Sequence, residues 1–226
     1  GYNAFDNIQD GVDAVNNSTV HVLAGNYDGF EIHGMTGLNV IGQDGAVVDG
    51  TPLPHMVVDN VLCQINTSSQ ISIQNLEFDG NAFTASEDAA VVCFDCTDTV
   101  LEDLVIYNCY NATDDYPSYA VYVEGGGDAT VDIVNPTFYD NEVGIYVEED
   151  TVNVSGGSIQ GGGTEASYCS TGIIALSGST VSVSGTEIFD MWSTDITPSG
   201  EAPGATGPEA GFGVVAYDID ADGEAP

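Results

Sequence analysis

The sequence predicts an all-β solenoid of parallel strands, and two repeated patterns predict it. Three segments share one alternation of apolar residues that is broken by a turn residue, at 130–141, 151–162 and 180–191. Each is followed by a second, shorter apolar run, at 144–150, 172–178 and 213–219. Repeats of about 20–50 residues that hold only strands and turns indicate stacked coils, because one repeat cannot bury its own apolar face.

The register of the repeat follows from residues two apart, which share one face of a strand. Gly or Asn marks the corner inside the first runs, at Asn135, Gly156 and Gly185. Val61 and Cys63 fit an early second run. Two complete earlier copies have the residues Ile71, Ile73, Phe78, Val91 and Cys93, and then Leu101, Leu104, Ile106, Val121 and Val123.

Insertions interrupt the repeat only between a first run and a second run. They cover 82–89, 111–118, 163–170 and 192–211. In a stack of coils we expect them to line up along one flank, and such a flank is often the interacting face of a repeat protein.

Composition limits the partners of the chain. Its 226 residues include no Lys or Arg and 36 Asp and Glu, which gives a formal net charge of −36. No fixed cation can neutralise phosphate, so anionic lipid is a poor partner and no nucleic-acid partner is expected. The charge repels itself, so we expect stability and self-association to depend on cations, salt or low pH. No apolar run is long enough to span a membrane, so direct membrane insertion is not expected.

A short amphipathic helix is expected before the first coil. Apolar residues with helical spacing would cover the open end of that coil, namely Phe5, Ile8, Val12 and Val15. The chain 1–226 is then one domain with a cap at 1–17, coils at 18–219 and an acidic tail at 220–226. No cap follows the last coil, and open strand edges there favour the addition of another subunit.

Residues 5–50 resemble the opening of proteins of the pectate-lyase-like superfamily. The stretches that carry the resemblance are FDNIQDGVDAV, STVHVLAGNYDGFEIHG and LNVIGQDGAVVDG. The sequence is most similar to the repeat-containing surface proteins common in archaea, which are related to a periplasmic copper-maturation family. The resemblance implies a right-handed parallel β-helix of about seven coils at ~4.8 Å each, with a short N-terminal capping helix.

Catalysis is not expected from the motifs of that superfamily. Its lyases commonly rely on an Arg or Lys base, and its pectin-hydrolysing branch uses an Arg–Ile–Lys motif beside paired aspartates and a His. The chain has no Arg or Lys. Asp114 and Asp115 could supply two carboxylates for glycoside hydrolysis, but neighbouring residues on a strand point apart. The sequence therefore predicts that the chain is not an enzyme.

Cation binding is expected on charge grounds, and calcium is the candidate cation. Asp218, Asp220 and Asp222 match the first half of an EF-hand-type loop, without its twelfth-position Glu. A frayed acidic tail is the alternative interpretation. The acids at 148–150 are a second oxygen cluster, for which the alternative is a solvated turn. The three histidines, and the lone C-x-x-C at 93–96, are weak indications of a transition-metal site.

Four of the five cysteines are disulfide candidates. In the register above, Cys63 and Cys93 are equivalent inward positions about 4.8 Å apart, so they form either a disulfide or stacked core thiols. Cys109 and Cys169 both lie on the insertion flank and are the second candidate pair. Cys96 is left over, and an odd cysteine indicates an intermolecular bond or a free thiol.

The chain is predicted to be a non-enzymatic structural subunit of an extracellular cell-envelope assembly, with copies of itself as partners. Its missing tryptic sites, open end and odd cysteine resemble the protease-resistant tubular sheath of filament-forming methanogens. Glycans could be attached at the sequons Asn16, Asn17, Asn66, Asn111 and Asn153. The alternative is a polysaccharide-binding or -cleaving β-helix, with an aromatic surface from Tyr107, Tyr110, Tyr116, Tyr119, Tyr122 and Tyr146.

Overall fold

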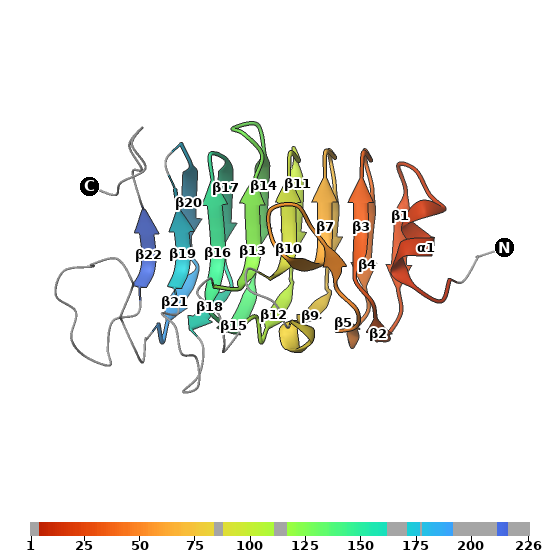
Figure 1. Cartoon of the computed structure of the whole chain (residues 1–226), viewed down its shortest axis with the longest axis horizontal. Coiled ribbons are helices and arrows are strands. Elements are labelled where there is room, and N and C mark those ends of the chain that lie inside the picture. The colour runs from red at the N-terminus through yellow and green to blue at the C-terminus, as the bar shows by residue number, and fades with distance from the viewer. Residues whose placement is uncertain are drawn as a thin grey trace.

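The chain winds through three parallel sheets and places one strand in each sheet per coil (Figure 1). The structure is a computed structural model that describes residues 5–83, 88–110, 117–161, 171–176, 178–191 and 212–216. Seven coils stack along the long axis of this described part. This arrangement confirms the predicted parallel β-helix.

We name the sheets A, B and C in the order in which the chain meets them. From first coil to last, sheet A contains β1 (Thr19–Val22), β4 (Asn39–Gly42), β8 (Ser72–Gln74), β11 (Thr99–Glu102), β14 (Thr130–Val134), β17 (Thr151–Ser155) and β20 (Thr180–Ser184). Sheet B contains β2 (Gly25–Tyr27), β5 (Ala46–Val48), β9 (Glu77–Asp79), β12 (Val105–Tyr107), β15 (Thr137–Asn141), β18 (Ser158–Gly161) and β21 (Glu187–Phe189). Sheet C contains β3 (Phe30–His33), β7 (Asn60–Asn66), β10 (Ala89–Phe94), β13 (Tyr119–Glu124), β16 (Val143–Glu148), β19 (Thr171–Ala175) and β22 (Phe212–Ala216).

The core consists of apolar rows, one or more from each sheet, that run along the inside of the coils. The inward row of sheet B is Phe78, Ile106, Phe138, Ile159 and Ile188. The inward row of sheet A includes Val40, Ile73, Leu101, Ile133 and Val154. Apart from Ile188, these side chains are at most 1% exposed, and burial of each contributes about 1.5–3 kcal/mol.

Burial declines in the last coil. Val183 continues the sheet A row beyond Val154 but is 42% exposed. Its strand β20 is the end strand of sheet A, so it has a neighbouring strand on one side only within the described residues.

The corner between sheets A and B needs a left-handed backbone in five successive coils. The angle φ is 53° at Asn75, 53° at Asp103, 50° at Asn135, 65° at Gly156 and 69° at Gly185. Asn, Asp and Gly are the residues that tolerate this conformation. The three corner residues predicted from the repeat are therefore confirmed.

Helix α1 (Ile8–Asp13) covers the first coil, as predicted for a cap. It begins after Asn7, whose side chain accepts a hydrogen bond from the backbone N–H of Asp10 at 2.7 Å. Ile8 is buried against the coil. The Gln9 amide donates to the Glu31 carbonyl at 3.1 Å and accepts the Glu31 N–H at 2.7 Å, so it satisfies the open edge of β3.

The longer loops project from the coils between a strand of sheet B and the following strand of sheet C, which is where the repeat predicts the insertions. Large parts of those insertions, at 84–87, 111–116, 162–170 and 192–211, lie outside the described residues. One excursion that is described connects β5 to β7 and includes β6 (Leu53–Pro54), which pairs antiparallel with β7. The excursion lies over the outer face of sheet C (Figure 1). Its residues Leu53, Val57 and Val58 pack there with side chains of that sheet.

Membrane-spanning helices need roughly 20 residues, whereas α1 has six. No helix in the described ranges could cross a bilayer. The predicted acidic tail at 220–226 lies outside the described residues, so its boundary stays a prediction.

Candidate functional site

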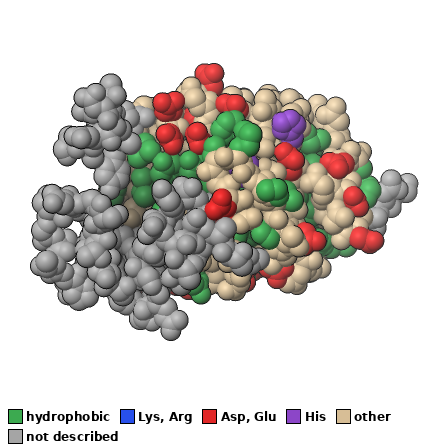
Figure 2. Space-filling view, viewed as in Figure 1, with side chains coloured by type: hydrophobic (Ala, Val, Ile, Leu, Met, Phe, Trp, Pro, Cys, Tyr) green, Lys and Arg blue, Asp and Glu red, His purple; other side chains and the backbone are tan. Residues whose placement is uncertain are grey.

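Two neighbouring rows of outward side chains cross the outer face of sheet C, and we call them together the outer strip. The first row is His33, Asn66, Phe94, Glu124 and Glu148, one from each of five successive strands. The second row is Glu31, Gln64, Val92, Tyr122 and Tyr146. Four strand spacings of about 4.8 Å give each row a length of roughly 19 Å. Figure 2 shows this face, where acidic and hydrophobic side chains lie next to one another.

A pocket of about 520 Å³ opens at the N-terminal end of the outer strip. One wall comes from the strands of sheet C and the other from the excursion around β6. Its lining residues are Glu31, His33, Pro54, His55, Met56, Gln64, Asn66, Thr67 and Phe94. A concave site with a few convergent polar groups is the usual form of a ligand site.

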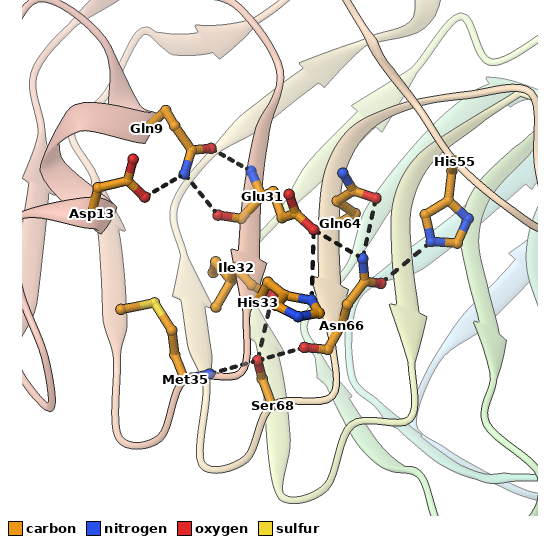
Figure 3. Close-up of polar contacts among 10 residues, drawn as sticks. All are labelled: Gln9, Asp13, Glu31, Ile32, His33, Met35, His55, Gln64, Asn66 and Ser68. Carbon is orange, nitrogen blue, oxygen red and sulfur yellow. Dashed lines mark hydrogen bonds and ion pairs between the residues drawn. The ribbon is translucent and has the colours of Figure 1, made fainter.

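Asn66 is the centre of a hydrogen-bond network in this pocket (Figure 3). Its Nδ2 donates to Oε1 of Glu31 at 3.2 Å and to Oε1 of Gln64 at 3.2 Å. Its Oδ1 faces Nε2 of His55 at 3.3 Å. Because three side chains depend on one amide, the pocket wall is held in a single arrangement.

His55 is held as a neutral imidazole. The backbone N–H of Val57 donates to its Nδ1 at 3.2 Å, so that nitrogen carries no proton. The proton is then on Nε2, which donates to Oδ1 of Asn66. Burial lowers the pKa of His55, and this outweighs the opposite effects of Asn66 and Glu31.

Glu31 and His33 form an acid–base pair at the mouth of the pocket. They lie two residues apart on β3 and so share its outer face. Nδ1 of His33 is 3.8 Å from Oε1 of Glu31, and their side chains are 67% and 39% exposed. Both groups are therefore accessible to a ligand in the pocket.

Farther along the outer strip, two tyrosine–glutamate pairs repeat one another. The Tyr122 hydroxyl donates to Oε2 of Glu124 at 3.0 Å, and the Tyr146 hydroxyl donates to Oε2 of Glu148 at 3.2 Å. The two tyrosine rings are stacked, with centroids 4.7 Å apart and an interplanar angle of 14°. The second pair is thus the first pair moved by one strand spacing.

The environment of the Glu124 carboxyl group raises its pKa. Burial raises the pKa of Glu124, the Tyr122 hydrogen bond partly offsets that effect, and the charge of Glu148 raises the pKa further. A carboxyl group whose pKa is raised in this way is suited to general acid catalysis. Chemically, the outer strip can therefore donate a proton and accept one at adjacent positions.

Part of the predicted aromatic surface is buried, whereas Tyr110 is 42% exposed. Tyr119 and Tyr122 are only 5% and 7% exposed. They belong to a second apolar cluster outside the coils, with Val58, Val61, Ala89, Val92 and Val143. Tyr107 lies on sheet B instead, where it stacks on Tyr139 at 5.0 Å. Tyr116 lies outside the described residues.

The predicted stacking of Cys63 on Cys93 is wrong. Cys63 pairs with Val91, and Cys93 pairs with Ile65. A slip of two residues adds roughly 6.6 Å along the strand, which places the two Cα atoms beyond the disulfide range of about 7 Å. The slip escaped the sequence pattern because a shift of two residues leaves the same side chains facing inward. Both residues are buried free thiols of the core, but they are not stacked on one another as predicted.

Cys96 is a free thiol without access to solvent. It is 0% exposed, so its thiol cannot reach another chain as the intermolecular alternative requires. The Cys93 thiol donates a hydrogen bond to it, which lowers the pKa of Cys96 and raises that of Cys93. Cys109 is also a buried free thiol, and its candidate partner Cys169 lies outside the described residues.

The candidate calcium ligands Asp218, Asp220 and Asp222 lie outside the described residues. Within the described ranges, no group of three or more His, Cys, Asp or Glu side chains is arranged to hold a metal ion. In the cluster at 148–150, Asp150 is only 1% exposed and accepts N–H groups of Gly127 and Ala129, so it is not part of a solvated turn.

Three of the sequons are exposed on the described surface, at Asn16, Asn17 and Asn153. Asn66 instead uses its amide in the pocket network, so a glycan there would remove that network. Asn111 lies outside the described residues, as do Asp114 and Asp115.

Sequence reasoning missed most of the pocket. Asn66 entered only as a sequon, His55 only as a weak metal ligand, and neither Glu31 nor Gln64 was predicted. One signal was available: Glu31 and His33 have the same two-residue spacing on β3 as Gln64 and Asn66 have on β7. The correct register of these two runs would have brought all four together.

The fold of the chain is similar to that of several solved structures. The structure is similar to one titled a "putative glycosyl hydrolase" from Parabacteroides merdae ATCC 43184, with TM-score 0.55, 13% identity, and 80% of this chain and 88% of that chain covered. A pectin methylesterase from Yersinia enterocolitica has TM-score 0.47 and 8% identity, with 97% and 95% covered. A pectin methylesterase in complex with a hexasaccharide has TM-score 0.48 and 12% identity, with 98% and 80% covered. No curated protein matches the chain.

The prediction that the chain is not an enzyme is contradicted, because the similar structure with TM-score 0.55 is titled a putative glycosyl hydrolase. That prediction depends on the absence of Arg and Lys. Carboxylate, imidazole and tyrosine groups can carry out acid–base chemistry without either residue.

The family model for the right-handed β-helix region matches residues 2–159. The repeat, the three parallel sheets and this match agree, and the chain belongs to the right-handed β-helix family.

Proposed function

We propose that the chain binds a polysaccharide along the outer strip and hydrolyses its glycosidic bonds. The observation that carries the proposal is the pair of repeated tyrosine–glutamate contacts, which holds Glu124 and Glu148 at adjacent positions. Two flanking carboxyl groups are what most glycoside hydrolases need. The fold likeness to a structure named as a putative glycosyl hydrolase supports the proposal.

In this mechanism Glu124 is the general acid and Glu148 the nucleophile. Glu124 donates its proton to the leaving glycosidic oxygen as that C–O bond breaks, and the Glu148 carboxylate forms a bond to the anomeric carbon. Glu124, now ionised, takes a proton from water, and the resulting hydroxide displaces Glu148. The raised pKa of Glu124 suits the first role. Tyr122 and Tyr146 position the two carboxyl groups.

The spacing of the pair predicts the stereochemistry. Side chains on adjacent strands stand about 4.8 Å apart, which is closer to the ~5–5.5 Å of retaining enzymes than to the ~6.5–9.5 Å of inverting ones. We expect the first-formed product to keep the anomeric configuration of the substrate. Proton NMR of a reaction in progress measures this, and an inverted first product would contradict the nucleophile role of Glu148.

The test of the function is reducing-sugar release from hexasaccharides of β-1,4-linked glucose, glucosamine and N-acetylglucosamine, and of α-1,4-linked galacturonic acid. We expect the wild-type chain to cleave at least one of them. Glu124→Gln and Glu148→Gln should each lower the rate by at least about 10²-fold. Glu102→Gln removes one carboxylate from the outer face of sheet A and is the matched control, with an unchanged rate. Unfolding temperatures of the three variants are the control for folding. Full activity of both Glu124→Gln and Glu148→Gln would refute the assignment of these residues as catalytic.

Assembly of copies into a cell-envelope structure, extracellular location and calcium binding stay predictions. Filaments or sheets seen by electron microscopy would add an assembly role to the activity proposed for the outer strip.

A further inference from the structure

We infer that the polysaccharide taken by the outer strip is an amine-bearing, cationic glycan. The inference rests on the proposed function and names its substrate class. It starts from the carboxylates of the strip and pocket, which are Glu31, Glu124 and Glu148. The chain contains no Lys or Arg, so none of them has a basic partner of fixed charge.

The pocket selects for a positive group. Its walls offer Glu31 as the charged side chain, and the groups around that carboxylate are the amides of Gln64 and Asn66 and the neutral ring of His55. His33 also lines the pocket, 3.8 Å from Glu31, and its side chain is largely exposed. An ammonium group in the pocket would pair with Glu31, whereas a sugar carboxylate would meet a like charge.

Phe94 adds an aromatic face to the same pocket. It stands next to Asn66 in the first row of the strip, and its ring contacts His55 edge-on, with centroids 6.2 Å apart. Ammonium groups are attracted to the face of an aromatic ring by about 0.5–2 kcal/mol. A carboxylate beside an aromatic ring therefore favours an amine over an uncharged amide of similar size.

The register extends this preference over the length of a polymer. Glu31 lies on β3 and Glu124 on β13, three strand spacings or roughly 14 Å away, with Glu148 one spacing farther. A glycan with an amine on each ring meets a carboxylate at both ends of the strip. A single amino sugar meets one carboxylate and gains less.

The charge of the whole molecule acts in the same direction. A net charge of −36 raises the local concentration of cationic polymers and repels polyanions such as galacturonate chains. The effect on association weakens as salt screens it, with a Debye length of about 10 Å at 0.1 M.

The test compares binding of four hexamers to the full chain by calorimetry at low and high salt: glucosamine, N-acetylglucosamine, galacturonate and hexalysine. We expect the glucosamine hexamer to bind at least tenfold more tightly than each of the others. Glu31→Gln should reduce that preference about tenfold, and Glu102→Gln should leave it unchanged.

Each other outcome overturns the inference in a recognisable way. If the N-acetylated or galacturonate hexamer binds as tightly as glucosamine, the substrate class is wrong and the proposed function stands. If hexalysine binds as tightly and Glu31→Gln has no effect, the amine is attracted by overall charge alone. If no sugar binds or is cleaved, the inference and the proposed function both fail.

Discussion

Single residues of the outer strip act largely by orienting other side chains. Asn66 fixes three groups of the pocket, and each tyrosine of the strip fixes one glutamate. Tyr122 keeps its proton, because burial raises the pKa of its hydroxyl. It is therefore a constant donor to Glu124 over the working range of the site.

Tyr122→Phe should change the pH dependence of cleavage. The hydroxyl favours the ionised form of Glu124, so its loss raises the pKa of that carboxyl further. As a general acid Glu124 works protonated, so the alkaline limb of the rate profile should move to higher pH. Tyr139→Phe, on sheet B, is the control and should leave the profile in place. A lower rate with no movement of the limb would mean that Tyr122 only packs against the sheet.

Asp150 is a buried carboxylate, and two substitutions there distinguish the effect of its hydrogen bonds on stability from the effect of its charge. Its Oδ1 accepts from Ala129 at 2.9 Å and from Gly127 at 3.1 Å, while its Oδ2 is buried without a hydrogen bond. Asp150→Ala leaves the buried N–H of Ala129 unsatisfied and should cost about 1–3 kcal/mol. Asp150→Asn keeps the acceptor and should cost less. Urea unfolding measures both, and equal losses would contradict a role for the acceptor.

At the scale of strands and corners, the backbone sets the tolerance to mutation. Gly157 and Gly126 both have positive φ, of 63° and 68°. A Cβ at Gly157 would lie 2.2 Å from the Pro136 carbonyl oxygen, whereas a Cβ at Gly126 meets nothing within 4 Å. The two glycines therefore share a backbone conformation and differ in the space around it.

Gly157→Ala should be clearly more destabilising than Gly126→Ala. The left-handed conformation alone costs an alanine about 1–2 kcal/mol, and the clash with backbone adds about 1–3 kcal/mol at Gly157. We expect free-energy losses of about 1–2 kcal/mol for Gly126→Ala and about 2–5 kcal/mol for Gly157→Ala from denaturant unfolding. Similar losses for both would show that Pro136 moves aside freely.

Period-two alternation explains why the coils could be predicted from sequence and the site could not. Inward positions such as Ile133 and Phe138, and corners such as Asn135, follow directly from the alternation and from residues that tolerate positive φ. Alternation is blind to a slip of two residues, which misplaced Cys63. The pocket depends on which outward residues of different coils become neighbours, and on the excursion that brings His55 over them. The two-residue spacing shared by β3 and β7 is a sequence signal for the neighbouring residues only once the register is known, and the excursion has no local signal.

The whole molecule combines a compact core with a large uncompensated charge. Self-repulsion among 36 acidic residues opposes the folded state. Burial adds to this by raising the pKa values of Glu124 and Asp150. The self-repulsion should make the unfolding temperature depend on salt, and the raised pKa values should make it depend on pH.

Salt should stabilise the chain. Between 0.01 M and 1 M the Debye length falls from about 30 Å to about 3 Å, so repulsion across the surface is screened. We expect the unfolding temperature to rise with sodium chloride, measured by circular dichroism. A flat response would mean that the charges are too far apart to oppose folding.

Lower pH should stabilise it as well. Unfolded carboxyl groups titrate near pH 4, and Glu124 and Asp150 titrate at higher pH when folded. Between these values the folded chain binds more protons, so the free energy of unfolding falls as pH rises through that window. We expect a higher unfolding temperature at about pH 5 than at pH 7. The double variant Glu124→Gln, Asp150→Asn should flatten this slope relative to Glu102→Gln.

The outer strip takes its positions from the stacking of coils, one position for every coil. Strand spacing is set by backbone hydrogen bonds and cannot adjust to a ligand. If the repeat length of a polymer differs from the strand spacing, the offset between its sugar rings and the residues of the strip grows with each repeat. Contacts therefore coincide over a limited stretch, and the place where they coincide decides which bond of a long chain meets Glu124 and Glu148.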